Sequence, residues 1–163
     1  MKRTTLFFED VLDAESVNAL IYLISKSKKP VDLFISTQGG SLSAAKVLLH
    51  HINNNVEDIN IYLTGYVASA GTFFLTDCTK PVYITPDLIF LLFHTIDMPQ
   101  ETMTRKEDVS SKEMKKQLDA DNKVLLEKYR ELGLNEKELK SFLKGEEVVL
   151  YRKDFDRLKA KKC

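Results

Sequence analysis

Ser69 is the residue of this sequence best suited to nucleophilic chemistry. It lies in the stretch YVASAGTFFL (residues 66–75), where an apolar strand pattern ends, an apolar helix pattern begins and the neighbouring residues are small. The first amides of a helix lack intrahelical partners and carry partial positive charge. A hydroxyl there could attack a carbonyl carbon while the amide of Ala70 stabilises the oxyanion. A serine that only caps the helix is the alternative, because V-A-S-A-G is not the G-x-S-x-G signature of the α/β-hydrolases.

Two further segments could supply the other groups that acyl transfer needs. TQGGS (residues 37–41) lies between a predicted strand and a predicted helix, and its glycines let a backbone amide face a cleft with no side chain in the way. His94 directly follows the apolar run LIFLLF and could act as general base and then as general acid. A tight turn with Ser41 as helix cap, and a structural histidine, are the alternatives. His50 and His51 are adjacent on one predicted helix, so they suit neither a metal pair nor a base.

Three ordered segments carry a resemblance to a known family. FISTQGGSLSAAKVLLHHI, GYVASAGTFFLTD and LIFLLFHTI resemble, in that order, the proteolytic subunit of the ATP-dependent Clp proteases. That family has a strand followed by a double-glycine loop, a G-x-x-A-S-x-G nucleophile motif, and a histidine after an apolar strand. Here the nucleophile motif is filled by Gly65, Ala68, Ser69 and Gly71. Ser69 lies 29 residues after Gly40 and 25 before His94, and both intervals match the family pattern.

The resemblance, which runs from about residue 4 to residue 96, implies a fold and a set of roles. The implied fold is α/β, a crotonase/Clp-protease-like ββα superhelix with a helical, handle-like C-terminal region. Ser69 would be the nucleophile of a serine endopeptidase and His94 its general acid/base. The oxyanion hole would consist of the amides of Gly40 and Ala70. The substrate would be an extended or unfolded polypeptide, held by main-chain hydrogen bonds beside the loop of Gly39, Gly40 and Ser41. No cofactor and no metal is implied.

The third member of the triad is less well defined. The family carries its acidic residue after the long helices, and the corresponding segment here is GEEVVLYRKDF (residues 145–155). Aligning Val149 with the family's aromatic position places Glu147 where aspartate is usual. Glu146 is an adjacent competitor, an exposed acidic pair is the plain alternative, and the triad could also be incomplete.

Hydrophobic periodicity predicts the elements that must position these groups. Strands alternate with helices in the first part, which predicts a parallel sheet buried on both faces. The expected strands are residues 4–8, 31–36, 59–63, 81–85, 88–93 and 148–151. The expected helices follow Asp13 and Ser41, run from Ser69 to Asp77, begin at a capping box of Ser110 and Glu113 and at Asn135, and include the Lys-rich tail. We expect one domain, 1–163, with a core (about 4–96), a charged helical region (about 100–145) and a C-terminal strand and helix (146–163).

Composition narrows the classes of partner. The formal net charge is zero, so no basic field indicates nucleic acid, and no apolar run is long enough to cross a membrane. Two cysteines form no disulfide framework, and no signal peptide is recognisable, so we expect a cytoplasmic protein. The resemblance implies a homo-oligomeric ring. Departures from the family pattern make an AAA+ unfoldase partner less expected. The chain begins close to its first core strand, where the family carries a segment that engages the ATPase. In addition, STQGG replaces the family's S-P-G-G.

Two other functions are compatible with the same fold. One is a catalytically impaired scaffold subunit that has lost its third triad residue. The other is a crotonase-type acyl-CoA enzyme, in which the oxyanion hole polarises a thioester. That chemistry usually needs carboxylates near the second oxyanion donor, whereas this chain offers Ser69 followed by Ala70.

Overall fold

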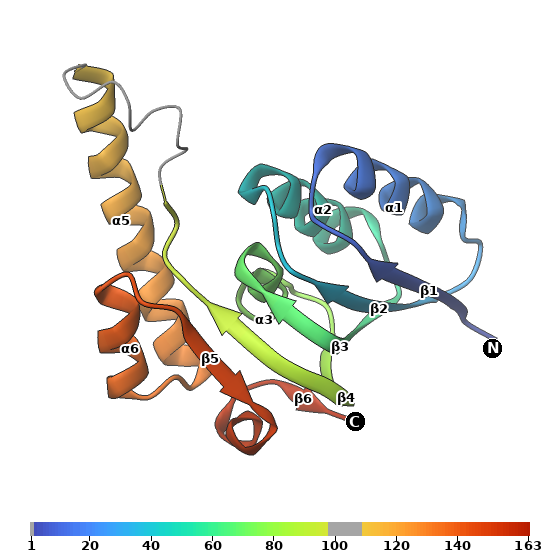
Figure 1. The fold of residues 1–163 in the computed structure, drawn as a ribbon. Coiled ribbons are helices and arrows are strands. Elements are labelled where there is room, and N and C mark those ends of the chain that lie inside the picture. Colours follow the sequence, from blue (N-terminus) through green and yellow to red (C-terminus); the bar gives the residue numbers. More distant parts are fainter. Residues whose placement is uncertain (1, 98–108) are drawn as a thin grey trace. The chain divides into compact units, whose positions relative to one another are not determined.

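The computed structural model describes residues 2–97 and 109–163, which form two compact units. Unit 1 consists of Met1–Phe93 with Val149–Cys163, and unit 2 of His94–Val148. Figure 1 shows their elements. None of the helices in the described ranges is both long and apolar enough to cross a membrane.

Unit 1 is built on a sheet whose first four strands are parallel. Its strands follow the order β1 (Thr4–Glu9), β2 (Val31–Thr37), β3 (Ile59–Ala68), β4 (Val82–Phe93) and β5 (Val148–Tyr151), with β6 (Lys161–Lys162) pairing with β4. The first four strands pair in parallel, so the carboxyl ends of β2 and β3 lie at the same edge. The 37–41 loop and Ser69 both leave the sheet at that edge, which confirms the predicted succession of strands and loops.

Two helices, α1 (Ala14–Lys26) and α2 (Leu42–Asn55), pack side by side on one face of this sheet (Figure 1). Asp13 and Ser41 cap them as predicted, since their side chains accept hydrogen bonds from the amides of Ser16 and Ala44. The apolar spacing of each helix puts its buried residues on one stripe. These residues are Val17, Leu20, Ile24, Ala44, Ala45, Leu48, Leu49 and Ile52.

The other face of the sheet carries a row of stacked aromatic rings. Phe7 and Phe34 have centroids 5.2 Å apart, Phe34 and Tyr62 4.7 Å, and Tyr62 and Tyr83 5.1 Å. Lys161 places its ammonium 5.5 Å from the centroid of Tyr83, within cation–π range. Phe7 is 75% exposed, so the prediction that both faces of the sheet are buried is wrong at β1. Successive side chains of a strand point to opposite faces, so these rings form a separate row on this face, where they stack on one another.

Residues 82–93 form one strand rather than the two that were predicted. Pro86 suggests a break, because proline cannot donate to a strand ladder. The ladder instead shifts register there, from Leu63 paired with Ile84 to Gly65 paired with Leu88. The hydroxyl of Thr85 donates to the carbonyl of Leu63 over 2.9 Å and bridges the irregularity. Proline is tolerated at such a bulge because no ladder bond is required of it.

The Lys-rich tail is not the helix that was predicted. After β5 the chain makes a 3-10 helix, η2 (Arg152–Arg157), and then β6, whose residues pair with Tyr83 and Ile84. Only Phe155 and Leu158 are buried in this stretch. Two apolar anchors three residues apart suffice for a single turn, and the lysines that follow offer no apolar face that would continue a helix.

Unit 2 contains the helices α5 (Val109–Leu132) and α6 (Glu136–Leu143). Its core includes Tyr129 and Phe142, whose rings meet edge to face with centroids 5.3 Å apart. Asn135 caps α6 in a capping box with Glu138, as predicted. The capping box predicted at Ser110 and Glu113 falls at the start of α5, where the side chain of Ser110 lies outside what the structure describes.

Replacing Leu48 by alanine tests the packing of α2 on the sheet. Leu48 is fully buried, so Leu48→Ala should lower the free energy of unfolding by about 2–5 kcal/mol through lost burial and the cavity left behind. Val47, next to it on the same helix, is 54% exposed, and Val47→Ala should change that free energy by less than about 0.5 kcal/mol. Urea denaturation followed by circular dichroism measures both, and equal losses would contradict the packing.

Candidate active site

Ser69 sits in a strained turn between β3 and the 3-10 helix η1 (Ser69–Thr72), which continues into α3 (Phe73–Asp77). Its φ is +55°, and Ser69 is the only non-glycine residue with positive φ among those the structure describes. Such a conformation costs roughly 1–3 kcal/mol and persists only when its surroundings enforce it. The hydroxyl of Thr72 donates to the carbonyl of Ser69 over 2.7 Å and holds the turn closed. The serine is half-buried at the end of the strand.

The loop of residues 37–41 lies directly against this turn. A Cβ placed on Gly39 would lie 2.6 Å from the Cβ of Ser69 and 3.1 Å from the nitrogen of Ala70. Gly39 also has φ of +95°, which side-chain-bearing residues rarely adopt. Only glycine therefore allows this backbone to approach the serine and the amide that follows it. The contact brings together the two segments that sequence reasoning assigned to one site.

The hydrogen bonds of the loop indicate which amide remains available. The amide of Gly39 donates to Thr37 Oγ1 over 3.1 Å. The carbonyl of Gly39 accepts from the amide of Leu12 over 2.8 Å, and the amide of Ser41 donates to the carbonyl of Leu12 over 2.7 Å. None of the hydrogen bonds found within the described ranges uses the amide of Gly40. The amide of Ala70 lies in the first turn of η1, where helix amides have no intrahelical acceptor.

Thr37 fixes the loop and the turn to each other. It is 1% exposed, and its hydroxyl donates to the carbonyl of Asp10 over 2.6 Å. A Cβ on Gly71 would lie 2.6 Å from the methyl group of Thr37, so the start of η1 packs closely on this side chain. Thr37 thus joins three segments of the chain, and the sequence analysis did not single it out.

Ser41, which was predicted to belong to the substrate loop, serves in the structure as a helix cap. Its hydroxyl accepts from the amide of Ala44 over 3.3 Å and lies 2.8 Å from the hydroxyl of Ser43. Its amide is bonded to Leu12. Of the three predicted loop residues, Gly39 therefore contacts the serine turn, and Gly40 keeps its amide available. The hydroxyl of Ser41 caps α2, and its amide is bonded to Leu12.

His94 begins unit 2, and its ring has a defined partner. Its Nδ1 lies 2.7 Å from the carbonyl oxygen of Thr95. A carbonyl oxygen can only accept, so Nδ1 carries the proton. In the neutral ring Nε2 then keeps a lone pair, which is the form that a general base requires. The ring is half-buried.

Glu147 and Glu146 are both exposed at the end of unit 2. Within the described part of that unit, no hydrogen bond or ion pair joins either carboxylate to His94. The role of Glu147 as third triad residue stays a prediction.

Asn122 on α5 was missed by the sequence analysis. Its side-chain amide bonds to both backbone groups of Ile96, two residues after His94. It lies on the apolar stripe of α5, between Leu118 and Leu125. A polar residue within an apolar stripe is the signal that could have found it.

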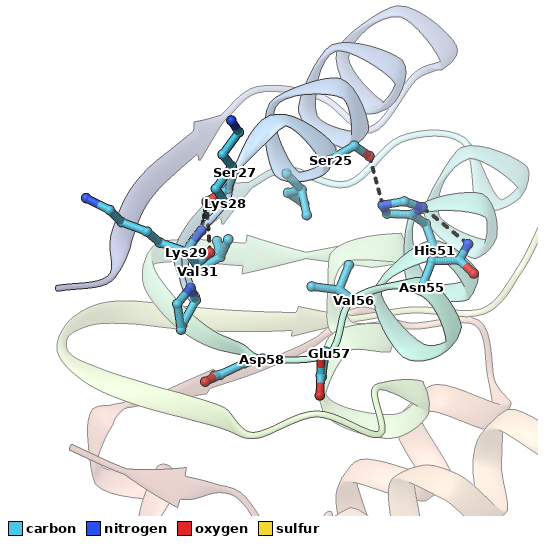
Figure 2. A pocket seen from close by; sticks show the side chains of 12 residues that line it. Ser25, Ser27, Lys28, Lys29, Val31, His51, Asn55, Val56, Glu57 and Asp58 are labelled. Atoms are coloured by element: carbon cyan, nitrogen blue, oxygen red, sulfur yellow. Dashed lines mark hydrogen bonds between the residues drawn. The ribbon is translucent and has the colours of Figure 1, made fainter. Parts of the chain in front are cut away.

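A second serine–histidine contact lies at the other end of the sheet in unit 1. Ser25 Oγ is 3.5 Å from His51 Nε2, and His51 Nδ1 is 3.4 Å from the side-chain nitrogen of Asn55 (Figure 2). They line a hollow of about 810 Å³ that also includes Lys28 and Asp58. Ser25 is exposed within α1, where its neighbouring amides are engaged in the helix. Ser25 therefore differs from Ser69, which lies at the start of a helix where the first amides have no intrahelical acceptor.

Other candidate groups are weaker. Burial raises the pKa of the Cys78 thiol, which keeps it protonated and unreactive at neutral pH. Among the residues that the structure describes, no group of three His, Cys, Asp or Glu side chains could hold a metal ion.

Comparison with known proteins identifies the family. The model of the Clp protease family matches residues 5–95, more than half of the chain. The chain belongs to the Clp protease family. An asparagine-to-aspartate mutant of ClpP1 from Listeria monocytogenes has a similar structure, with a TM-score of 0.63 and 17% sequence identity over 98% of this chain and 90% of that one. This likeness confirms the expected Clp-protease-like fold. A comparison with curated proteins finds no match.

Replacing Gly39 by alanine tests the contact between the loop and the serine turn. Gly39→Ala should lower the free energy of unfolding by about 1–2 kcal/mol for its positive φ and by a further 1–3 kcal/mol for the clash with Ser69. Gly145 provides a matched control, because its φ is +77° but a Cβ there would meet no atom within 4 Å. Gly145→Ala should show the first loss only. Urea titration measures both, and a Gly39→Ala variant no less stable than Gly145→Ala would contradict the close approach.

Proposed function

We propose that this member of the Clp protease family is a serine endopeptidase with Ser69 as nucleophile and His94 as general acid/base. The family and the fold support a peptidase. The observation that carries the assignment of Ser69 is its strained turn, held against a glycine loop that leaves no room for a side chain at Gly39. The amides of Gly40 and Ala70 are the proposed oxyanion donors.

The proposed reaction is acyl transfer in two steps. His94 Nε2 accepts the proton of the Ser69 hydroxyl as Oγ bonds to the peptide carbonyl carbon, and the oxyanion is stabilised by the two amides. The C–N bond then breaks, and the departing amine takes the proton from His94. Water attacks the acyl-enzyme by the same route and releases the second product. Ala68 is paired with Leu92, so the strands that lead to Ser69 and His94 are neighbours in the sheet.

The proposed substrates are extended or unfolded polypeptides. An extended chain can bind through main-chain hydrogen bonds, which accept many sequences. Members of the family form oligomeric rings and work with unfoldases. For this chain we propose a homo-oligomeric ring in the cytoplasm, and leave an AAA+ partner as the less favoured part of the proposal.

A catalytically impaired scaffold is the second candidate. Two observations favour it: both carboxylates predicted for the third position are exposed, and the Nδ1 of His94 bonds to a backbone carbonyl.

Labelling with a fluorophosphonate probe tests the nucleophile. The probe should modify the wild-type protein but not Ser69→Ala, and His94→Ala should lower the labelling rate by about 10²–10⁴-fold because the base is lost. Mass spectrometry of the tryptic peptides locates the label.

Ser25→Ala is the matched control for that experiment, because Ser25 also has a histidine neighbour. Its labelling should equal that of wild type. An assembled wild-type protein that takes no label would overturn the peptidase proposal in favour of the scaffold. A label on Ser25 would show that Ser25, and not Ser69, is the nucleophile.

Glutamine variants of the two adjacent acids test the third position. If Glu147 orients His94, Glu147→Gln should lower kcat by up to about 10⁴-fold, and Glu146→Gln should change it little. The rate of cleavage of a fluorogenic peptide measures both. Rates within twofold of wild type for the two variants would exclude both Glu146 and Glu147 as the third triad residue.

A further inference from the structure

We infer that Asn122 is a positioning residue for His94, acting through the Thr95–Ile96 peptide group; this inference rests on the proposed role of His94 as base. All four residues belong to unit 2. The inference identifies a holder for the imidazole that is built from backbone and an amide side chain.

The geometry is a chain of three hydrogen bonds. Asn122 Oδ1 accepts from the amide of Ile96 over 2.8 Å, and its Nδ2 donates to the carbonyl of Ile96 over 3.0 Å. The two bonds together fix which end of the side-chain amide is oxygen. The carbonyl of Thr95 accepts from His94 Nδ1 over 2.7 Å.

One peptide group transmits the effect. The amide of Ile96 and the carbonyl of Thr95 are the two ends of the same planar unit. Fixing the amide therefore fixes the direction of the carbonyl that receives the proton of His94. A hydrogen bond to one end of such a unit also polarises the other end, so the two bonds strengthen each other.

This arrangement can do two of the things that a triad carboxylate does. It holds the ring in one orientation, and it keeps the proton on Nδ1 so that Nε2 is free to accept one. A carbonyl is neutral, so it gives less support to the imidazolium than a carboxylate would. A fixed orientation matters for the rate, because a displacement of 1 Å can cost about a hundredfold.

The position of Asn122 agrees with a specific role. It lies four residues after Leu118 and three before Leu125, on the apolar stripe of α5. Asparagine is a weaker helix former than leucine, so helix stability alone would favour an apolar residue here. The side chain is half-buried and uses both of its polar ends on a segment 26 residues away in sequence.

The full-length protein with ¹⁵N-labelled histidine provides the test. Two-bond ¹H–¹⁵N correlation spectra report which ring nitrogen of His94 carries the proton, with His94→Gln used to assign the signals. Wild type should show the proton on Nδ1. In Asn122→Ala the preference should be lost, and kcat for a fluorogenic peptide should fall about a hundredfold with KM within twofold.

Two further variants separate positioning from general damage. Asn122→Leu keeps the bulk of the side chain on the apolar stripe and should show the same two losses in a folded protein. Asn53 is a matched control, because its side-chain amide bonds in the same way to the carbonyl of Asp77 and the amide of Thr79, in unit 1. Asn53→Ala should leave both the His94 proton position and kcat as in wild type.

The outcomes distinguish this inference from the proposed function. A folded Asn122→Leu protein with wild-type His94 spectra and kcat would overturn the positioning role, as would an equal loss of kcat in Asn53→Ala. A wild type without peptidase activity or Ser69 labelling would overturn the proposed function, while the His94 spectra would still decide whether Asn122 orients the ring.

Discussion

The close approach between the backbone of Gly39 and the turn at Ser69 is the constraint on which the rest of the proposed site depends. A side chain at Gly39 would occupy the space between the serine and the amide of Ala70. The contact requires β2 and β3 to end at the same edge of a parallel sheet, and Thr37 to lie under both loops. The strain at Ser69 is stable because these neighbours leave the turn no other conformation.

In unit 2, hydrogen bonds of polar groups fix the segment that carries His94. Here residues 94–97, which follow β4, are bonded to α5 through Asn122. Asn122 satisfies both backbone groups of Ile96, a residue in a segment without regular secondary structure that would otherwise need water. The side chain of His94 bonds to the carbonyl of Thr95, which belongs to the same peptide group as the amide of Ile96. The segment thus acquires one conformation without belonging to a helix or a strand.

Local signals in the sequence predicted most of the fold, and they named the residues that the structure brings together at the candidate site. Double glycine after a strand, and a serine among small residues, are features of short stretches, so Gly39, Gly40 and Ser69 could be named beforehand. The positive φ of Ser69 could not, because serine has no preference for it and the surroundings impose it. Asn122 was missed because its partner is the backbone of Ile96, and backbone groups leave no trace in sequence. The tail was taken for a helix because lysine is a good helix former, although nothing there could be buried.

The irregularity near Pro86 also limits how this fold can vary in length. Between the pairs Ile61–Val82 and Ala68–Leu92, seven steps along β3 run beside ten along β4. The three surplus residues determine which face of the sheet each later side chain of β4 occupies and which residue of β3 it pairs with. Loss of one residue would move the core side chains of Leu88–Phe93 to the opposite face of the sheet. Loss of two would keep the faces but shift these residues by about 6–7 Å along β3. Insertions and deletions acceptable in surface loops are therefore excluded from this internal stretch, which works as a spacer of fixed length.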